Sequence, residues 1–197
     1  MYPYLETIKL LNGEFFRLKY HRQRMNNVRA MGVNLPEFDI EKLLKDSDFP
    51  ATGLFKCRFL YGTEGYNISY EVYERRKIES LKLIELDIEK TPFKSADRSA
   101  YQRAFQLRNN CDDVLISTHG LMADSSYANV AFFDGHQWLT PAKPLIPGTN
   151  RAMLLEQEKI CLAEIKSDTL GSYEKISIFN AMIEFGEIEL PVSKITI

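Results

Sequence analysis

The chain has 197 residues, of which 45% are hydrophobic, and 25 basic against 27 acidic side chains give a formal net charge of −2. This length allows one large domain or two small ones, and the apolar content is sufficient for a hydrophobic core. Because the sequence has no run of basic residues, we expect neither nucleic acid nor an anionic membrane as a partner. It also has no basic-then-apolar leader and no segment long enough to cross a bilayer, so we expect a soluble, cytoplasmic protein.

The three cysteines are far apart in the sequence. Cys57, Cys111 and Cys161 form no CxxC pair. This spacing predicts reduced, mostly buried thiols, and neither a disulfide framework nor a metal site.

The first half of the chain predicts an α+β unit. Alternation around Asn12-Gly13 indicates a β-hairpin, and apolar residues at helical spacing before Gly32 indicate a helix that ends there. The predicted elements are a hairpin over 7–18, a helix over 21–31, a helix capped by Asp39, and strands over 54–61 and 66–73. A strand over 82–92 leads into a connection. We place the domain boundary there, which predicts domains of residues 1–89 and 90–197.

The second half predicts many short strands and two helices, a pattern that indicates a small barrel-like domain. The turns between the strands carry His119-Gly120 and Asp134-Gly135. The predicted helices cover 97–110 and 151–163, and the predicted strands cover 114–117, 121–123, 129–133, 137–139, 176–179 and 192–195.

One lysine has an unusual position. Lys94 follows Pro92 and precedes the helix predicted over 97–110. A lysine in such a connection is ordinarily a solvated surface charge. A lysine that forms an imine needs an amine that can lose its proton, held on rigid scaffolding beside a cofactor carbonyl. The position between a proline and a helix would supply that rigidity.

A single acid precedes a run of small residues in the second half. Asp124 stands five residues before Asn129, which opens a predicted strand. Its ordinary interpretation is a turn carboxylate or a helix cap. The alternative is a carboxylate that keeps the ring nitrogen of a pyridine cofactor protonated, because a protonated ring is the better electron sink.

Two further segments are suited to an anion. Gly148-Thr149-Asn150 precedes a predicted helix, and the free backbone N–H groups at a helix start bind anions without a charged side chain. The same residues would also serve as an ordinary loop-to-helix connection. Arg24 lies three residues after His21, and a guanidinium suits bidentate phosphate binding better than an ammonium. His21 itself is predicted to have a structural role.

These motifs resemble the class IV aminotransferase family, the fold-type IV pyridoxal-phosphate enzymes. The resemblance extends over nearly the whole chain, from Glu6-Thr7-Ile8 through Asn180-Ala181-Met182 to Pro191-Val192. It implies an α+β fold of two domains, with a small N-terminal α+β domain and a cofactor-binding, barrel-like C-terminal domain.

The resemblance also implies pyridoxal 5'-phosphate as cofactor and a role for each matching residue. Lys94, with Arg98 four residues on, corresponds to the Schiff-base lysine, and Asp124 to the acid at the ring nitrogen. Most relatives have Glu in place of this Asp, and many have Arg-Gly where this chain has Tyr61-Gly62, which leaves their substrate-carboxylate contact without a counterpart there. The residues that the resemblance assigns to the cofactor are Arg24, Lys94, Asp124, Asn129, Thr149, Asn150 and Asn180.

The family implies a small-molecule amino substrate and a homodimer. Asn180-Ala181-Met182 resembles the Asn-Ala-Leu version that is typical of the aminodeoxychorismate lyase branch, which releases pyruvate and forms p-aminobenzoate for folate synthesis. A branched-chain or D-amino acid aminotransferase would use the same lysine and acid and is the second hypothesis. The third is a non-catalytic relative that binds the cofactor or a protein partner.

Overall fold

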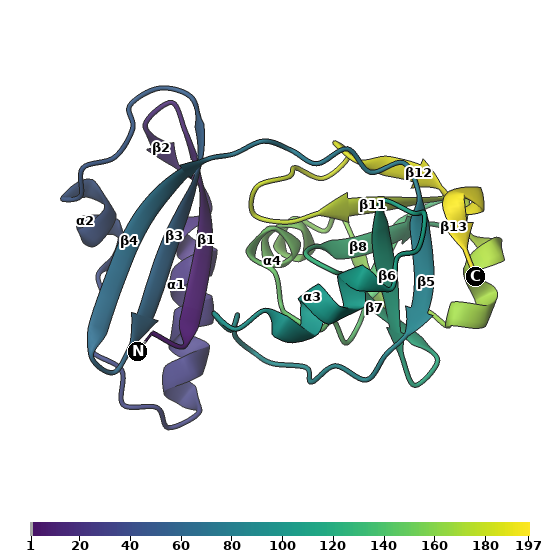
Figure 1. The fold of residues 1–197 in the computed structure, drawn as a ribbon, viewed down its shortest axis with the longest axis horizontal. Coiled ribbons are helices and arrows are strands. Elements are labelled where there is room, and N and C mark those ends of the chain that lie inside the picture. The colour runs from purple at the N-terminus through teal and green to yellow at the C-terminus, as the bar shows by residue number, and fades with distance from the viewer. Residues whose placement is uncertain (1) are drawn as a thin grey trace. The chain divides into compact units, whose positions relative to one another are not determined.

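The computed structural model describes residues 2–197, which divide into two compact units. The N-terminal unit contains the described residues through Arg75 together with Pro92–Asp97, and the C-terminal unit contains Arg76–Thr91 and Arg98–Ile197. Both units combine helices and strands, which confirms the predicted α+β class (Figure 1). Within residues 2–197, no helix has the length and apolar character that crossing a bilayer requires.

The N-terminal unit is built on one antiparallel sheet with strand order β2-β1-β3-β4. Asn12 and Gly13 form the turn between β1 and β2 with positive φ angles of 50° and 81°, the backbone conformation that tight hairpin turns need. The predicted hairpin is confirmed, although its first strand begins earlier than expected. The strands are β1 (Tyr4–Leu11), β2 (Glu14–Phe15), β3 (Leu54–Gly62) and β4 (Gly65–Val72).

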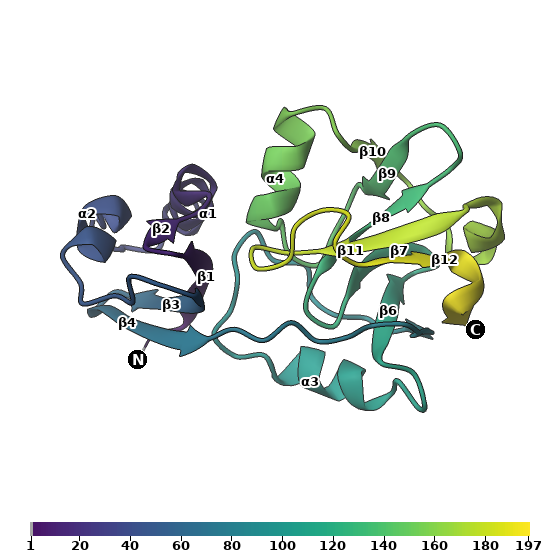
Figure 2. The same cartoon turned by 90° about the horizontal axis from the view of Figure 1, so that it is seen from above.

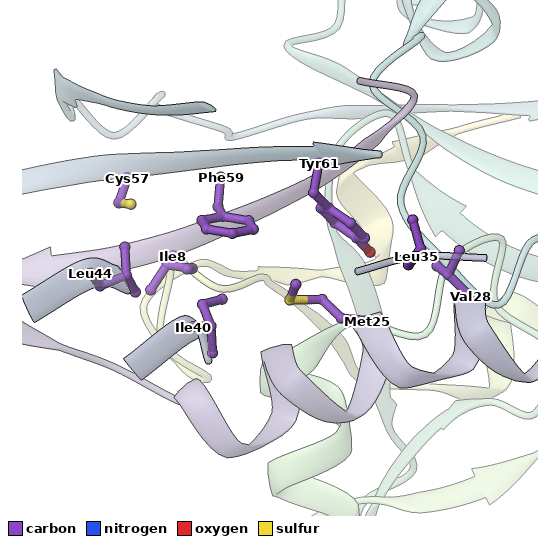
Figure 3. Packing of buried hydrophobic residues seen from close by; sticks show 9 residues of the cluster. All are labelled: Ile8, Met25, Val28, Leu35, Ile40, Leu44, Cys57, Phe59 and Tyr61. Carbon is purple, nitrogen blue, oxygen red and sulfur yellow. The ribbon is translucent and has the colours of Figure 1, made fainter. Parts of the chain in front are cut away.

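Two helices, α1 (Leu18–Ala30) and α2 (Ile40–Lys45), cover one face of this sheet (Figure 2). Asp39 accepts a hydrogen bond from the Lys42 N–H, which confirms the predicted cap. Gly32, with a φ of +83°, follows α1 at the predicted stop. The core between the helices and the sheet is drawn in Figure 3 and consists of Ile8, Met25, Val28, Leu35, Ile40, Leu44, Cys57, Phe59 and Tyr61.

The C-terminal unit contains two separate hydrogen-bonded sheets. One has the order β13-β5-β6-β7 and the other has the order β10-β9-β8-β11-β12. The first comprises β5 (Leu81–Glu85), β6 (Asp113–Thr118), β7 (Leu121–Ser125) and β13 (Ile195–Thr196). The second comprises β8 (Asn129–Phe133), β9 (Trp138–Pro141), β10 (Cys161–Ala163), β11 (Lys175–Phe179) and β12 (Glu189–Pro191).

Each sheet of this unit packs against one helix. The helix α3 (Ser99–Gln106) places Ala104 in a core with Val114 and Ile116 of β6. The helix α4 (Thr149–Glu156) places Leu154 against Ala131 of β8.

Several predicted elements were wrong in extent. The helix expected over 151–163 ends at Glu156, because Glu158 takes a positive φ of 56° and Cys161–Ala163 then pairs with β9. The strand expected over 192–195 is interrupted, since Val192–Lys194 forms a short 3-10 turn. The helix predicted over 97–110 is likewise shorter, because α3 covers only Ser99–Gln106. Of the three free thiols Cys57 is buried, but Cys161 is exposed, contrary to the expectation of mostly buried cysteines.

Candidate functional site

Lys94 lies on a segment that runs alongside β1 and is fixed to it by backbone hydrogen bonds. The Leu5 N–H donates to the Lys94 carbonyl at 2.9 Å, and the Ala96 N–H donates to the Pro3 carbonyl at 2.8 Å. The half-buried Lys94 side chain donates from Nζ to Thr7 Oγ1 at 2.8 Å. The amine is therefore held on a rigid part of the N-terminal unit, as an imine-forming lysine requires.

Arg24 lies on α1 and faces a buried carboxylate of β1. Its Nε donates to Glu6 Oε1 at 3.0 Å, and its Nη2 contacts Glu6 Oε2. His21, one turn earlier on the same helix, bonds Glu6 Oε2 through Nδ1 at 2.5 Å. All three side chains are buried, so these bonds orient the Arg24 guanidinium. His21 is structural here, as the sequence suggested.

The electrostatics of this cluster favour a charged Glu6. Burial by itself raises the pKa of Glu6, but the Arg24 charge and the hydrogen bond from His21 outweigh it and hold the pKa at about 2. For His21, burial is the larger effect and lowers the pKa, while Glu6 opposes it. Glu6 and Arg24 thus form a buried, hydrogen-bonded ion pair.

Asp124 lies near the end of β7 and is 4% exposed. Its Oδ1 accepts from Asn129 Nδ2 at 2.8 Å, and its Oδ2 accepts from the N–H groups of Leu145 and Ile146 at 2.8 and 3.1 Å. Burial raises the pKa of Asp124 to about 7, against the effect of these donors. The carboxyl group is therefore fixed in position and titrates near neutrality.

Asn129 connects Asp124 to the segment before α4. Its Nδ2 also donates to the Ile146 carbonyl at 3.0 Å, two residues before Gly148. A Cβ on Gly148 would overlap Asn129 Oδ1, so this position requires glycine for close approach. The structure thus brings the predicted residues Asp124 and Asn129 together with the start of α4.

The start of α4 contains two more predicted residues, Thr149 and Asn150, both buried. Gly148 is the N-cap, and the first turn has neither an acidic residue nor a side-chain cap. Asn150 Nδ2 donates to the carbonyls of Asn180 and Ile183 at 2.9 and 3.0 Å. This helix start is therefore attached to the Asn180 loop.

The loop after β11 is shaped by Asn180. Its Oδ1 accepts from the N–H groups of Met182 and Ile183 at 2.8 and 3.1 Å, and its Nδ2 donates to the Tyr127 carbonyl at 3.4 Å. The predicted residues of the C-terminal unit therefore form one continuous polar group, which runs from Asp124 through Asn129 and α4 to Asn180.

Three contributors to these contacts were not among the predicted site residues. They are Glu6, Thr7 and Arg151, whose buried guanidinium donates to Thr140 Oγ1 and the Pro141 carbonyl at 3.2 and 2.7 Å. The signal for Glu6 was an acid that alternates with Tyr4 and Ile8 of the hydrophobic core; the contacts of Thr7 and Arg151 left no local signal. Residues 2–197 contain no group of three potential metal ligands.

Comparison with known proteins gives the context for this geometry. No protein-family model matches the chain. A crystal structure from Haemophilus somnus, described as "a putative 4-amino-4-deoxychorismate lyase", is 31% identical, with 93% of this chain and 98% of that chain covered and a TM-score of 0.86. The chain belongs to the class IV aminotransferase family.

A second relative agrees with this membership, and a more distant structure shares the fold. A Schizosaccharomyces pombe protein named "Putative aminodeoxychorismate lyase" is 29% identical over 194 residues, which cover 87% of this chain and 83% of that protein. A Mycobacterium tuberculosis structure, "A hypothetical aminotransferase", solved in its PLP-bound form, shares the fold at 17% identity, with a TM-score of 0.76 and 93% and 78% of the two chains covered. The resemblance recognised in the sequence is thus confirmed.

Proposed function

We propose that this family member is a pyridoxal-phosphate-dependent enzyme in which Lys94 carries the cofactor covalently. The observation that supports the proposal best is the Lys94 amine, held by Thr7 on a segment that backbone hydrogen bonds fix to β1. A solvated linker lysine needs no such support. Relatives described as lyases, and a fold neighbour solved with this cofactor, supply the chemical context.

The residues of each unit fit the parts of this cofactor. The start of α4, with a glycine N-cap and no acidic side chain in its first turn, suits a phosphate. The space around Gly148 is narrow, because a Cβ there would overlap Asn129 Oδ1. Thr149 and Asn150 contribute backbone N–H groups at this helix start, Asn180 shapes the adjoining loop, and Arg24 supplies a guanidinium oriented by Glu6.

The chain's own groups have distinct chemical tasks. When bound, pyridoxal phosphate supplies an electron sink for charge that develops at the substrate's α-carbon. Lys94 Nζ would hold the cofactor, and as a free amine beside it would be the base for the substrate's α-proton. Asp124 would keep a proton on the ring nitrogen of the bound cofactor. The Asn129 amide and the N–H groups of Leu145 and Ile146 hold its carboxyl group in place.

We infer that the reaction is the aminodeoxychorismate lyase reaction, with pyruvate released and p-aminobenzoate formed. The relatives named for this activity and the Asn180-Ala181-Met182 motif support it. An amino-acid aminotransferase is the second candidate, since both reactions need the same lysine and acid and a fold neighbour has that name. A homodimer, a cytoplasmic location and a place in folate synthesis are also proposed by resemblance.

The first experiment is a visible absorption spectrum of the purified chain with added pyridoxal phosphate, beside Lys94→Ala. We expect a protonated-imine band that borohydride bleaches in the wild type and that the variant lacks. Absence of the band from both proteins would instead favour the non-catalytic relative.

The second experiment separates the two reactions. Aminodeoxychorismate is supplied and pyruvate is assayed, in parallel with amino-acid donors and a keto-acid acceptor. Rapid transamination without pyruvate release would replace the lyase by the aminotransferase.

A further inference from the structure

The sheet of the N-terminal unit has a polar face, opposite the face that α1 and α2 cover. Because side chains alternate along a strand, Cys57, Phe59 and Tyr61 of β3 point toward the helices, as Figure 3 shows. Their neighbours in β3 and the matching residues of β1 and β4 point the other way. We define this polar face by Leu5, Thr7, Lys9, Lys56, Arg58, Leu60, Asn67, Ser69 and Glu71.

Arg58 is the neighbour of the residue that binds the Lys94 amine. In the antiparallel register Thr7 lies directly opposite Arg58, and Arg58 lies directly opposite Ser69. Directly opposed residues of antiparallel strands have Cβ atoms about 4.5–5.5 Å apart. Lys94 Nζ lies 2.8 Å from Thr7 Oγ1, so a long guanidinium side chain starts one strand away from the reactive amine.

The polar face is electropositive. Among the nine residues that define it, Lys9, Lys56 and Arg58 are cations and Glu71 is the only acid. Glu71 bonds Lys56 at 2.8 Å but lies 3.6 Å from Arg58, with side-chain exposures of 35% for Arg58 and 47% for Glu71. An exposed pair at this distance is weak, so an incoming carboxylate can replace Glu71 on Arg58 at small cost.

The other cations of this face are committed to different contacts. Lys56 is the direct partner of Glu71, and Lys9 is buried with its amine over the Phe16 ring. Tyr61, at the position where many relatives have Arg, is fully buried on the helix side of the sheet. Among the cations of the polar face, Arg58 is therefore the one whose weak ion pair can be exchanged for an incoming anion, on the strand next to Thr7.

We propose that Arg58 binds the carboxylate of the amino substrate whose amine reacts at Lys94. The substrate is then an amine that carries a carboxylate a few bonds away, and not a neutral amine. This inference rests on the proposed function, because it takes Lys94 as the reacting amine. Arg58 then sets the specificity for the substrate's carboxylate, and the Glu71 carboxylate competes with it for Arg58.

The test measures the binding of maleate, a carboxylate without an amine. Binding is followed through the change that maleate causes in the visible band of the chain loaded with pyridoxal phosphate. We expect Arg58→Gln to weaken maleate binding about ten- to hundred-fold, the loss of one charged hydrogen-bonding partner. Arg58→Lys should retain part of the affinity. Glu71→Gln should tighten binding several-fold, because it removes the competing carboxylate. Lys56→Gln, a charge change on the same strand and face, is the matched control and should have a smaller effect than Arg58→Gln.

The same variants should change KM for the amino substrate in the same order as they change maleate affinity, and they should change kcat less. A purely structural role for Arg58 predicts that Arg58→Gln and Glu71→Gln both impair binding, so opposite signs support the proposal. Equal maleate affinity in wild type and Arg58→Gln, or no response of the wild-type band to maleate, overturns it. If the wild type forms no band at all, the proposed function fails, which is a separate outcome.

Discussion

Asn129 Oδ1 occupies the space that a side chain on residue 148 would need, so Asn129 can take this position only because residue 148 is glycine. The amide nitrogen of the same Asn129 bonds both Asp124 and the Ile146 carbonyl. One amide group therefore fixes the acid at the end of β7 relative to the first turn of α4. In the proposed function, these two elements bind the ring nitrogen and the phosphate.

Gly148→Ala should destabilise the chain and weaken cofactor binding. The added methyl group displaces Asn129, and overpacking of this kind costs about 1–3 kcal/mol of unfolding free energy. Urea unfolding of the apo protein and titration with pyridoxal phosphate measure the two effects. Gly171→Ala is the matched control, since no atom lies within 4 Å of a Cβ there. Equal unfolding midpoints for the two variants would show that Asn129 simply moves aside.

Arg24→Met should cost about 3–5 kcal/mol of unfolding free energy, because it leaves the Glu6 carboxylate buried without its ionic partner. The double variant Glu6→Gln/Arg24→Met should recover part of this loss. Arg22→Met on the same helix is the control: Arg22 pairs with Glu41 at the surface, and such pairs contribute about 1 kcal/mol or less. Similar losses at Arg22 and Arg24 would contradict the buried ion pair.

Two of the buried carboxyl groups, Glu6 and Asp124, should together give stability a maximum in mildly acidic solution. Glu6 has a folded pKa of about 2, below its ordinary 4.5, so its contribution is present above pH 4.5 and is lost as the pH falls toward 2. Asp124 has a folded pKa of about 7, above its ordinary 3.8, so its contribution is present below pH 3.8 and is lost as the pH rises through 7.

Denaturant midpoints of the apo protein from pH 2 to 8 check this expectation. Asp124→Asn should be less stable overall but should show a smaller decline between about pH 4 and pH 7, the window set by the two pKa values of Asp124, while Asp113, whose pKa burial also raises, keeps its own part of the decline. Glu6→Gln should flatten the acid limb instead. A wild-type profile that is flat up to neutral pH would mean that the three N–H donors keep Asp124 ionised in the folded state.

Local signals predicted much of the fold and some of the site. Asn12-Gly13 and Asp39 specify a turn and a helix cap by their own chemistry, and both formed as expected. The end of α4 was missed because Glu158, which turns the backbone, is no recognised helix stop. The bond between Lys94 and Thr7 joins residues 87 positions apart, and strand register decides it. The sequence could suggest Lys94, but the pairing with Thr7, and hence the neighbouring Arg58, required the sheet.

Tyr61→Phe should leave the unfolding free energy unchanged or raise it by about 1 kcal/mol, since a buried polar group without a partner is costly. The Tyr61 hydroxyl has no hydrogen-bond partner among the described residues, and burial, followed by the charge of Glu6, raises the pKa of its phenol.

The matched control for Tyr61→Phe lies in the same unit. Tyr70 shares a 2.6 Å hydrogen bond with Ser47 Oγ, so Tyr70→Phe should cost about 0.5–1.5 kcal/mol. Urea midpoints of the two variants should therefore move differently although the chemical change is the same. A loss at Tyr61 as large as that at Tyr70 would mean that its hydroxyl has a partner in solution, such as a buried water molecule between β3 and α1.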